Sequence, residues 1–161
     1  MDILSNLYPD YQIDVAAEQD KLRWADVIVF QYPLYWADVI VFQYPLYWYM
    51  TPSLMNKWIE KVFVHGFSHG SNGNVLKDKY LIASLTTGTG EAAYSAGSGT
   101  TIEDLLAPIR LTAKLTQLNF VGYVVTHGVS YSLREDADKT QEMIAKSQAH
   151  AKKLVEMIES L

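Results

Sequence analysis

The chain has 161 residues, of which 49% are hydrophobic and 19% are charged, a composition that suits a folded domain with a buried core. Its formal net charge of −5 disfavours nucleic acid as a partner, because nucleic acid binds to basic surfaces. The absence of cysteine excludes disulfide bonds, thiolate metal ligands and a cysteine nucleophile, and the cytoplasm is the expected compartment. The first residues show neither a basic segment nor a long apolar run, so we expect no signal peptide.

The first predicted helix runs from Asp14 to Trp24, with Asp14 as its N-cap. It leads into a perfect duplication, because the segment from Ala25 to Trp36 recurs unchanged from Ala37 to Trp48. A solenoid needs at least three repeats, each of roughly 20 residues or more. We therefore interpret the duplication as a recent tandem event or an assembly artefact.

Each copy contains the run Val-Ile-Val-Phe, which is typical of a strand buried on both faces. Adjacent parallel strands need a connection of about a dozen residues or more, and these two runs lie closer together. We therefore expect either an antiparallel hairpin or the displacement of one copy from the sheet. Because the second copy leads directly into the next helix, we expect it to hold the regular position, as a strand from Val39 to Tyr44.

The next helix is predicted to begin with Thr51 as N-cap and Pro52 at the first helical position. Its apolar face comprises Leu54, Trp58, Ile59, Val62 and Phe63. A loop rich in Gly, Asn and Ser follows over residues 66–79. A buried strand over residues 80–85 then ends in a Thr-Thr-Gly-Thr-Gly turn.

Three more elements complete the chain. Thr100 and Glu103 fit a capping box at the start of a helix, which Pro108 is expected to kink or to enter near its first turn. A strand is predicted over residues 120–125, followed by His127 in a loop. The last helix starts at about Asp136, and His150 is expected on its solvated side. Its predicted buried face comprises Ile144, Gln148, Ala151, Leu154, Val155, Ile158 and Leu161.

Strands thus alternate with helices, which predicts an α/β fold with a mainly parallel sheet and helices on both faces. Ligands of such sheets bind beyond the carboxyl ends of the strands. The segments from Pro45 to Tyr49 and from Thr86 to Gly90 each follow a predicted strand directly. We therefore expect both segments at the same edge of the sheet.

Three segments carry a resemblance to a known family. They are the run from Phe42 to Phe63, the Gly-Phe-Ser-His-Gly motif at residues 66–70, and the run from Leu85 to Gly90 with Tyr94 after it. In this order and spacing they resemble the NAD(P)H:quinone oxidoreductases, which include the flavoprotein subunits of glutathione-gated potassium-efflux systems. The resemblance covers nearly the whole chain.

The resemblance implies one flavodoxin-like domain over residues 1–161, a three-layer sandwich around a mainly parallel sheet. It implies FMN or FAD as cofactor, NAD(P)H as co-substrate, and two-electron hydride transfer through the flavin to a quinone-type acceptor. It further implies a cytoplasmic homodimer with active sites at its interface and peripheral contact with a membrane transport system.

The resemblance also assigns the site residues. One side of the isoalloxazine would be bordered by Pro45, Leu46, Tyr47, Trp48 and Tyr49, and the other by Thr86, Thr87, Gly88, Thr89 and Gly90. Phe67 and His69 would line the substrate cavity, and Tyr94 matches the active-site tyrosine. Aromatic rings suit a flat flavin, and glycines let backbone N–H groups approach its edge. No metal is expected, because His65 and His69 lack further ligands at metal-binding spacing.

Two departures from the family pattern stand out. The usual first strand and its phosphate-binding loop are missing from this sequence, and the duplicated strand is a candidate to fill part of that vacancy. Relatives with a mammalian-type site place a histidine a few residues after the tyrosine, whereas Ser95 to Thr100 contain none. An alternative function is therefore a catalytically impaired relative, either a dimeric regulatory partner or a nonfunctional remnant.

Overall fold

The computed structural model describes residues 4–29, 32–33, 36–130 and 137–161. In chain order its elements are α1 (Leu4–Leu7), α2 (Val15–Trp24), β1 (Ala25–Val29), β2 (Tyr32–Pro33), β3 (Trp36–Pro45), α3 (Ser53–Val62), β4 (Tyr80–Thr86), the 3-10 helices η1 (Glu91–Tyr94) and η2 (Ala96–Ser98), α4 (Ile102–Leu105), α5 (Ala107–Leu115), β5 (Asn119–Thr126) and α6 (Ala137–Glu159). None of the described helices combines the length and hydropathy that crossing a bilayer requires.

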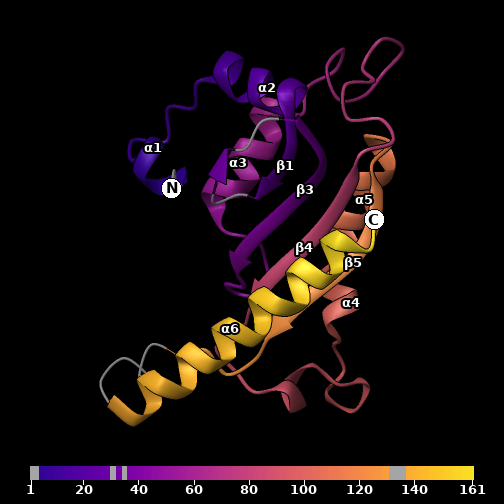
Figure 1. Cartoon of the computed structure of the whole chain (residues 1–161). Coiled ribbons are helices and arrows are strands. Elements are labelled where there is room, and N and C mark those ends of the chain that lie inside the picture. The colour runs from indigo at the N-terminus through magenta and orange to yellow at the C-terminus, as the bar shows by residue number, and fades with distance from the viewer. Residues whose placement is uncertain (1–3, 30–31, 34–35, 131–136) are drawn as a thin grey trace.

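The strands form a sheet in the order β2-β1-β3-β4-β5, in which β1, β3, β4 and β5 are parallel and β2 is antiparallel to β1. Helix α6 lies across one face of this sheet (Figure 1). Helices α2, α3, α4 and α5 pack against the other face. The predicted three-layer α/β architecture is confirmed.

The alternation of side chains along β3 explains its continuous apolar sequence. Ile40 and Phe42 belong to the larger core cluster, on the side of α3 and α5. Val39 and Val41 point the other way and pack with Leu154 of α6. Because helices cover both faces, every position in the run is buried and none needs to be polar.

The two duplicated copies are adjacent parallel strands, so the prediction that excluded this pairing was wrong. Residues Ala25–Val29 of copy one pair with Trp36–Val41 at the start of β3, with a register shift after Asp26. About seven residue steps from Val29 to Trp36 reach about 23–25 Å, whereas a five-residue strand rises only about 13–17 Å. The return is therefore long enough, and β2 pairs antiparallel with β1 on the way back.

Copy two holds the regular position, as predicted, since β3 pairs with β4 and leads into α3. The flavodoxin-like order 2-1-3-4-5 places the first strand beside the third. Here that place is taken by β1, which is copy one. The duplicated strand thus lies in the position that this order gives to the first strand.

Several predicted helix boundaries are shifted by one residue. Asp14 caps α2 as predicted, accepting a hydrogen bond from Ala17 N–H at 3.0 Å. Helix α3 instead has Pro52 as its N-cap residue, and the Thr51 hydroxyl donates to the Asn56 side chain. The capping box before α4 pairs Thr101 with Asp104, because the Asp104 carboxylate reaches the Thr101 backbone N–H.

Pro108 lies in the first turn of α5, where its missing N–H breaks no helical hydrogen bond. The segment before it forms the separate short helix α4.

The last helix differs more from prediction. Leu154 is buried, but Ile144 and Val155 are more than two-fifths exposed because the sheet covers only part of α6. His150 was predicted to be solvated and is in fact buried. Its Nε2 lies 2.7 Å from Ser84 Oγ, and its Nδ1 lies 2.7 Å from Thr126 Oγ1. Burial, and then the charge of Lys153, lower the pKa of His150.

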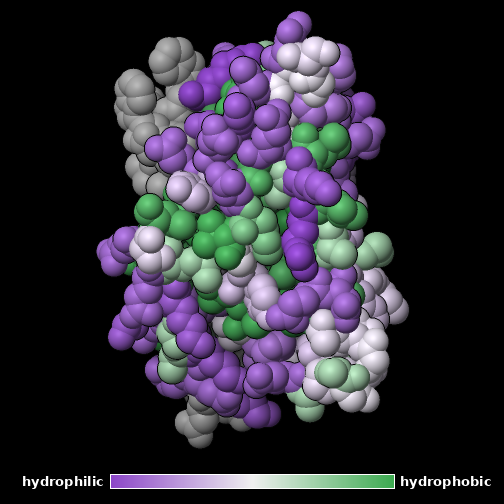
Figure 2. Space-filling view, turned by 90° about the vertical axis from the view of Figure 1, so that its right-hand side faces the viewer, coloured by the Kyte–Doolittle hydropathy of each residue, from purple (hydrophilic) through white to green (hydrophobic). Residues whose placement is uncertain are grey.

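The outer strand β5 leaves one edge of the sheet uncovered. Figure 2 looks onto this side of the molecule and shows apolar surface in its middle, bordered by hydrophilic side chains. The exposed apolar residues of β5 and its flanking helices include Leu111, Leu115, Val121 and Val155.

Candidate functional site

Two chain segments meet at the carboxyl ends of β3 and β4. Pro45 pairs with Thr86 at the last step of the parallel ladder, and Leu46 N–H donates to the Thr86 carbonyl at 2.8 Å. The structure thus places the predicted cofactor segments, Pro45 to Tyr49 and Thr86 to Gly90, at one edge of the sheet. Neither segment contains a charged residue.

The first of these segments continues into a tight, strained turn. Tyr47 and Met50 exchange backbone hydrogen bonds of 3.0 and 2.9 Å, and the two residues between them have positive φ, 50° at Trp48 and 64° at Tyr49. Aromatic residues rarely adopt this left-handed conformation, which costs about 1–3 kcal/mol per residue. The turn presents its rings to solvent, and Trp48 is 86% exposed. Such strain together with apolar exposure is typical of a binding surface.

The second segment is a glycine turn with open space beside it. A Cβ added at Gly88 or Gly90 would meet no atom within 4 Å, and neither glycine has a positive φ. The backbone conformation therefore does not require glycine, and the lack of side chains leaves the main chain open to a flat ligand. Thr87, directly before Gly88, is buried and continues the sheet, with its N–H donating to the Thr126 carbonyl. These features fit the edge of an isoalloxazine ring.

Tyr94 in η1 lies beside this turn. It packs against the core and also contacts the side chains of Thr89 and His127. Its hydroxyl is 2.9 Å from Thr89 Oγ1. Its ring stacks on His127, with the centroids 5.5 Å apart and the planes inclined by 26°. The sequence predicted a tyrosine without a neighbouring histidine. The structure supplies one from the segment after β5, and sequence spacing gave no signal for it.

A chain of hydrogen bonds fixes the tautomer of His127. The Thr87 hydroxyl donates its one hydrogen to the Thr89 carbonyl at 2.8 Å. Its oxygen must therefore accept from His127 Nδ1–H, 3.0 Å away. In the neutral imidazole Nε2 is then the unprotonated nitrogen, and it has no hydrogen-bond partner in the described part of the chain. This nitrogen can accept a hydrogen bond or a proton from a ligand.

Backbone contacts hold the histidine segment against the glycine turn. Gly128 N–H donates to Thr89 O at 2.9 Å, and Val129 N–H donates to Thr87 O at 2.8 Å. Gly128 has φ 73°, a conformation that favours glycine, and it completes the bend after His127. The arrangement of Thr87, Thr89, Tyr94 and His127 is therefore rigidly connected to β4 and β5.

The predicted substrate residues lie elsewhere. Phe67 and His69 belong to the loop between α3 and β4, which reaches the sheet at the amino end of β4, opposite the Thr86 end. Phe67 is 5% exposed, packs in the core and carries the Arg23 guanidinium 5.0 Å above its ring. His69 bonds to Ser68 Oγ at 3.0 Å. One chain therefore does not bring these two residues to the glycine turn.

A family model described as "Flavodoxin-like fold" matches residues 2–37 and 36–151. The chain belongs to this flavodoxin-like family. The two matched ranges meet at the boundary between the duplicated copies, so each range contains one copy. The resemblance to NAD(P)H:quinone oxidoreductases is confirmed by the following relatives.

This flavodoxin-like chain is 40% identical over 124 residues to the glutathione-regulated potassium-efflux system ancillary protein KefF of Enterobacter sp. (strain 638), covering 77% of the chain and 64% of that relative. The chain thus spans less than two thirds of the length of KefF. General stress protein 14 of Treponema denticola, solved with FMN, matches with a TM-score of 0.78 at 27% identity, over 96% of this chain and 79% of that one. An NADPH-quinone reductase from P. pentosaceus matches with a TM-score of 0.63 at 26% identity, over 87% and 76%.

Proposed function

We propose that this chain is a flavin-dependent NAD(P)H oxidoreductase that transfers two electrons, as hydride, through FMN to a quinone or a similar acceptor. The observation that carries the proposal is the meeting of the aromatic turn and the open glycine turn at one sheet edge, beside the Tyr94–His127 pair. The FMN complex and the quinone reductase among the structural relatives support it.

In this proposal FMN supplies the hydride chemistry and the chain supplies binding and orientation. Tyr47, Trp48 and Tyr49 cover the ring with apolar faces, and the backbone at Gly88 and Gly90 approaches its polar edge. Tyr94 is placed to donate a hydrogen bond at that edge. The chain acts as a single domain in the cytoplasm.

The proposal includes a homodimer. Phe67 is buried in the core, so of the two predicted substrate residues only the partly exposed His69 can reach a flavin site, and only if a second copy presents it. Sedimentation of the purified chain tests this part, and a monomer that reduces quinones would contradict the assignment of Phe67 and His69 to the substrate cavity.

Titration of the purified chain with FMN, following flavin fluorescence and visible absorption, tests the cofactor. We expect saturable binding at micromolar concentration or below, bleaching on addition of NADPH without oxygen, and recovery of the absorption with a quinone. A folded sample that does not bind FMN would overturn the proposal.

A second candidate is a catalytically impaired regulatory partner of a transporter. The name of the KefF relative, an ancillary protein of a potassium-efflux system, favours it. Under this alternative the chain raises potassium efflux from vesicles containing such a transporter even when FMN is absent. Efflux that needs bound FMN, or does not respond to the chain, speaks against it.

A further inference from the structure

The strand at the first-strand position does not lead into a phosphate-binding helix. In doubly wound sheets such a strand leads into a helix whose first N–H groups hold the phosphate of a nucleotide. Here that strand is β1, and only residues 30–31 separate it from β2, which pairs antiparallel with it. The last residue of β1, Val29, pairs with Val41, four residues before β3 ends at Pro45. At about 3.3 Å per residue, β1 therefore ends about 13 Å short of the end of β3.

The sequence of the nearby segments offers no cation in place of such a helix. Residues 27–37 contain no Lys, Arg or His, and no Gly, Ser, Thr or Asn. The segments 45–49 and 86–90 are likewise uncharged. The neighbouring charges along the chain are acidic, because Glu91 follows the glycine turn and Asp10 precedes Tyr11. A phosphate dianion bound among these segments would lose hydration without gaining an opposite charge.

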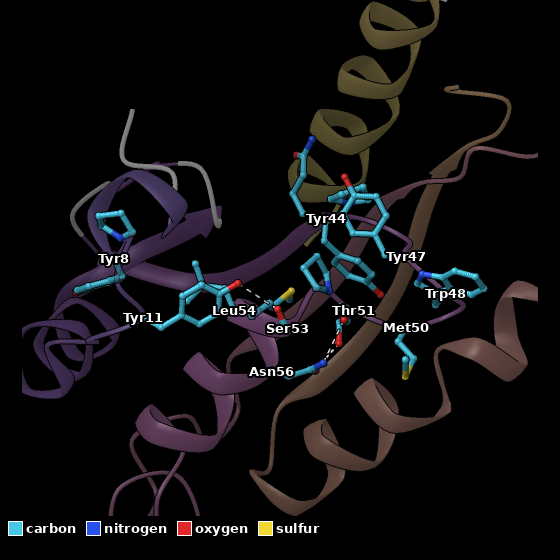
Figure 3. A pocket seen from close by; sticks show the side chains of 15 residues that line it. Tyr8, Tyr11, Tyr44, Tyr47, Trp48, Met50, Thr51, Ser53, Leu54 and Asn56 are labelled. Atoms are coloured by element: carbon cyan, nitrogen blue, oxygen red, sulfur yellow. Dashed lines mark hydrogen bonds between the residues drawn. The ribbon is translucent and has the colours of Figure 1, made fainter. Parts of the chain in front are cut away.

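A cavity of about 710 Å³ opens beside the Tyr47–Met50 turn, at the carboxyl end of β3 (Figure 3). It is bounded by the segment from Tyr8 to Tyr11, the end of β3 and the first turn of α3. It adjoins the proposed flavin surface through Pro45 and Trp48. Because small-molecule sites have volumes of about 300–1,000 Å³, the cavity has room for the chain that extends from a flavin ring.

Neutral hydrogen-bonding groups lie along the α3 side of this cavity. The Tyr11 hydroxyl and Ser53 Oγ are 3.3 Å apart (Figure 3). The Thr51 hydroxyl donates to the Asn56 side chain, and Asn56 Nδ2 donates to the Thr51 carbonyl at 3.1 Å. No charged residue is among the described lining. Hydroxyl and amide groups retain donors and acceptors beyond these bonds, so they suit a neutral polyol such as the ribityl chain of a flavin.

We propose that this chain binds riboflavin, the unphosphorylated and neutral flavin, at least as tightly as FMN, with the ribityl chain in this cavity. The proposal rests on the proposed flavin-dependent function and concerns which flavin the site prefers. The isoalloxazine, which carries the hydride chemistry, is the same in both flavins. The net charge of −5 further favours the neutral ligand over the dianion.

Fluorescence titration of the purified chain with riboflavin, FMN and lumiflavin tests the proposal. We expect riboflavin to bind as tightly as FMN or more tightly. One charge-assisted hydrogen bond to phosphate would instead favour FMN by about tenfold or more. A preference for FMN of about threefold or more would therefore overturn the proposal. Lumiflavin has the ring without the ribityl chain and should bind about tenfold more weakly than riboflavin. Equal binding of these two would remove the ribityl chain from the cavity and likewise reject the proposal.

Lys57 is a cation beside the cavity and provides the sharpest single substitution. Its ammonium lies 5.6 Å from the centre of the Tyr11 ring, and Lys57 is not among the lining residues. The ring face attracts the ammonium in this position. Lys57→Met should leave the ratio of the FMN and riboflavin dissociation constants unchanged. A ratio that moves against FMN by about threefold or more would show that Lys57 binds the phosphate, contrary to the proposal.

Two arginine substitutions at exposed apolar residues form a matched pair. Met50 lines the cavity and is 61% exposed, whereas Leu111 on α5 is outside the lining and 66% exposed. Met50→Arg adds a cation at the cavity and should shift the ratio of dissociation constants toward FMN by about 3- to 10-fold. Leu111→Arg should leave this ratio unchanged. Equal shifts, or no shift for Met50→Arg, would place the ribityl chain elsewhere and overturn the proposal. Thermal unfolding confirms that the variants fold.

The preference between flavins and the proposed function fail separately. A chain that prefers FMN by threefold or more and is reduced by NADPH keeps the function and loses the riboflavin preference. A chain that binds riboflavin and FMN equally but is not reduced by NADPH does the reverse. A folded chain that binds none of the three flavins would reject both.

Discussion

The ring of His127 stacks on that of Tyr94, with the centroids 5.5 Å apart, although Tyr94 lies in η1 and His127 follows β5. His127→Ala removes the stack and the donor to Thr87, interactions worth about 1 kcal/mol each. We expect quinone reduction by the FMN-loaded protein to fall about tenfold or more, since Tyr94 and the glycine turn lose their support. Steady-state kinetics measure the change.

Long-range ¹H–¹⁵N NMR checks the same relationship without flavin. The hydrogen-bond chain through Thr87 predicts the Nδ1–H tautomer for His127. His65→Asn serves as the kinetic control, because His65 is exposed at the opposite edge of the sheet. An Nε2–H tautomer, or a His127→Ala variant with unaltered kinetics, would contradict the assignment.

Substitutions in the glycine turn should change the affinity for FMN without lowering the free energy of unfolding. Gly88→Ala and Gly90→Ala add a methyl group into open space, at positions where the backbone does not need glycine. The free energy of unfolding should stay the same or rise by about 0.4–1 kcal/mol. The affinity for FMN should fall about tenfold or more, because the methyl group occupies the ligand's place. Gly97→Ala, which meets only Ser95 Oγ at 3.9 Å, should affect stability in the same way but leave the affinity for FMN unchanged. A loss of stability at Gly88 would show that the turn is structural.

Glu18 in α2 is a buried carboxylate that connects this helix to α3 and to the segment after α1. It accepts hydrogen bonds from the Tyr8 hydroxyl at 2.8 Å and from Trp58 Nε1–H at 2.8 Å, and pairs with Lys21 at 2.7 Å. Burial, and then the hydrogen bond to Glu18, raise the pKa of Tyr8. Glu18→Ala removes the acceptor of two buried hydrogen bonds and should lower the free energy of unfolding by about 1–3 kcal/mol in urea denaturation.

Lys21→Met is the comparison for this carboxylate. Because the Lys21 side chain is 38% exposed, its ion pair is screened by water, and its loss should cost less than about 1 kcal/mol. Equal losses for the Lys21 and Glu18 variants would mean that the ion pair, and not the buried hydrogen bonds, provides the stability.

His150 should make stability depend on pH. Its pKa in the folded state lies below the ordinary value of 6.5, because burial and the nearby Lys153 disfavour the charged form. The unfolded chain therefore binds the proton more readily, and stability is retained above about pH 6.5 and lost as the pH falls below it. Ser84, Thr126 and Lys153 are the groups that face the imidazole.

Thermal unfolding between pH 7.5 and 5 measures this dependence. His150→Gln, which does not titrate, should flatten the curve in that range, whereas His65→Asn should not. A wild-type protein whose melting temperature is constant from pH 7.5 to 5 would show that His150 is not buried in solution.

Removing residues 25–36 tests the structural role of the duplication. The product has the same sequence whichever copy is deleted, and its remaining copy should form β3. That strand would lose its parallel neighbour β1 and expose an unpaired ladder. We expect lower solubility and a lower urea midpoint. A shortened chain that is equally or more soluble would show that copy one contributes nothing to the sheet.

Local sequence pattern determined the elements of this protein. The apolar runs at Val39–Phe42 and Tyr80–Leu85 predicted buried strands. The caps predicted at Asp14 and Thr51 placed helix starts within a residue, because such signals depend on neighbours along the chain. The strand–helix alternation then indicated that the segments after Tyr44 and Leu85 meet at one edge of the sheet. The sequence alone therefore predicted that these two segments are neighbours.

Only the tertiary structure decided which distant groups meet. His127 reaches Tyr94 because β5 and β4 are parallel neighbours, and His150 is buried because α6 crosses the sheet over Ser84 and Thr126. Phe67 lies in the core away from the glycine turn, and copy one lies beside copy two, where β1 pairs with β3. Contacts between residues far apart in the chain depend on how whole helices and strands pack. The spacing of residues along the chain does not predict that packing.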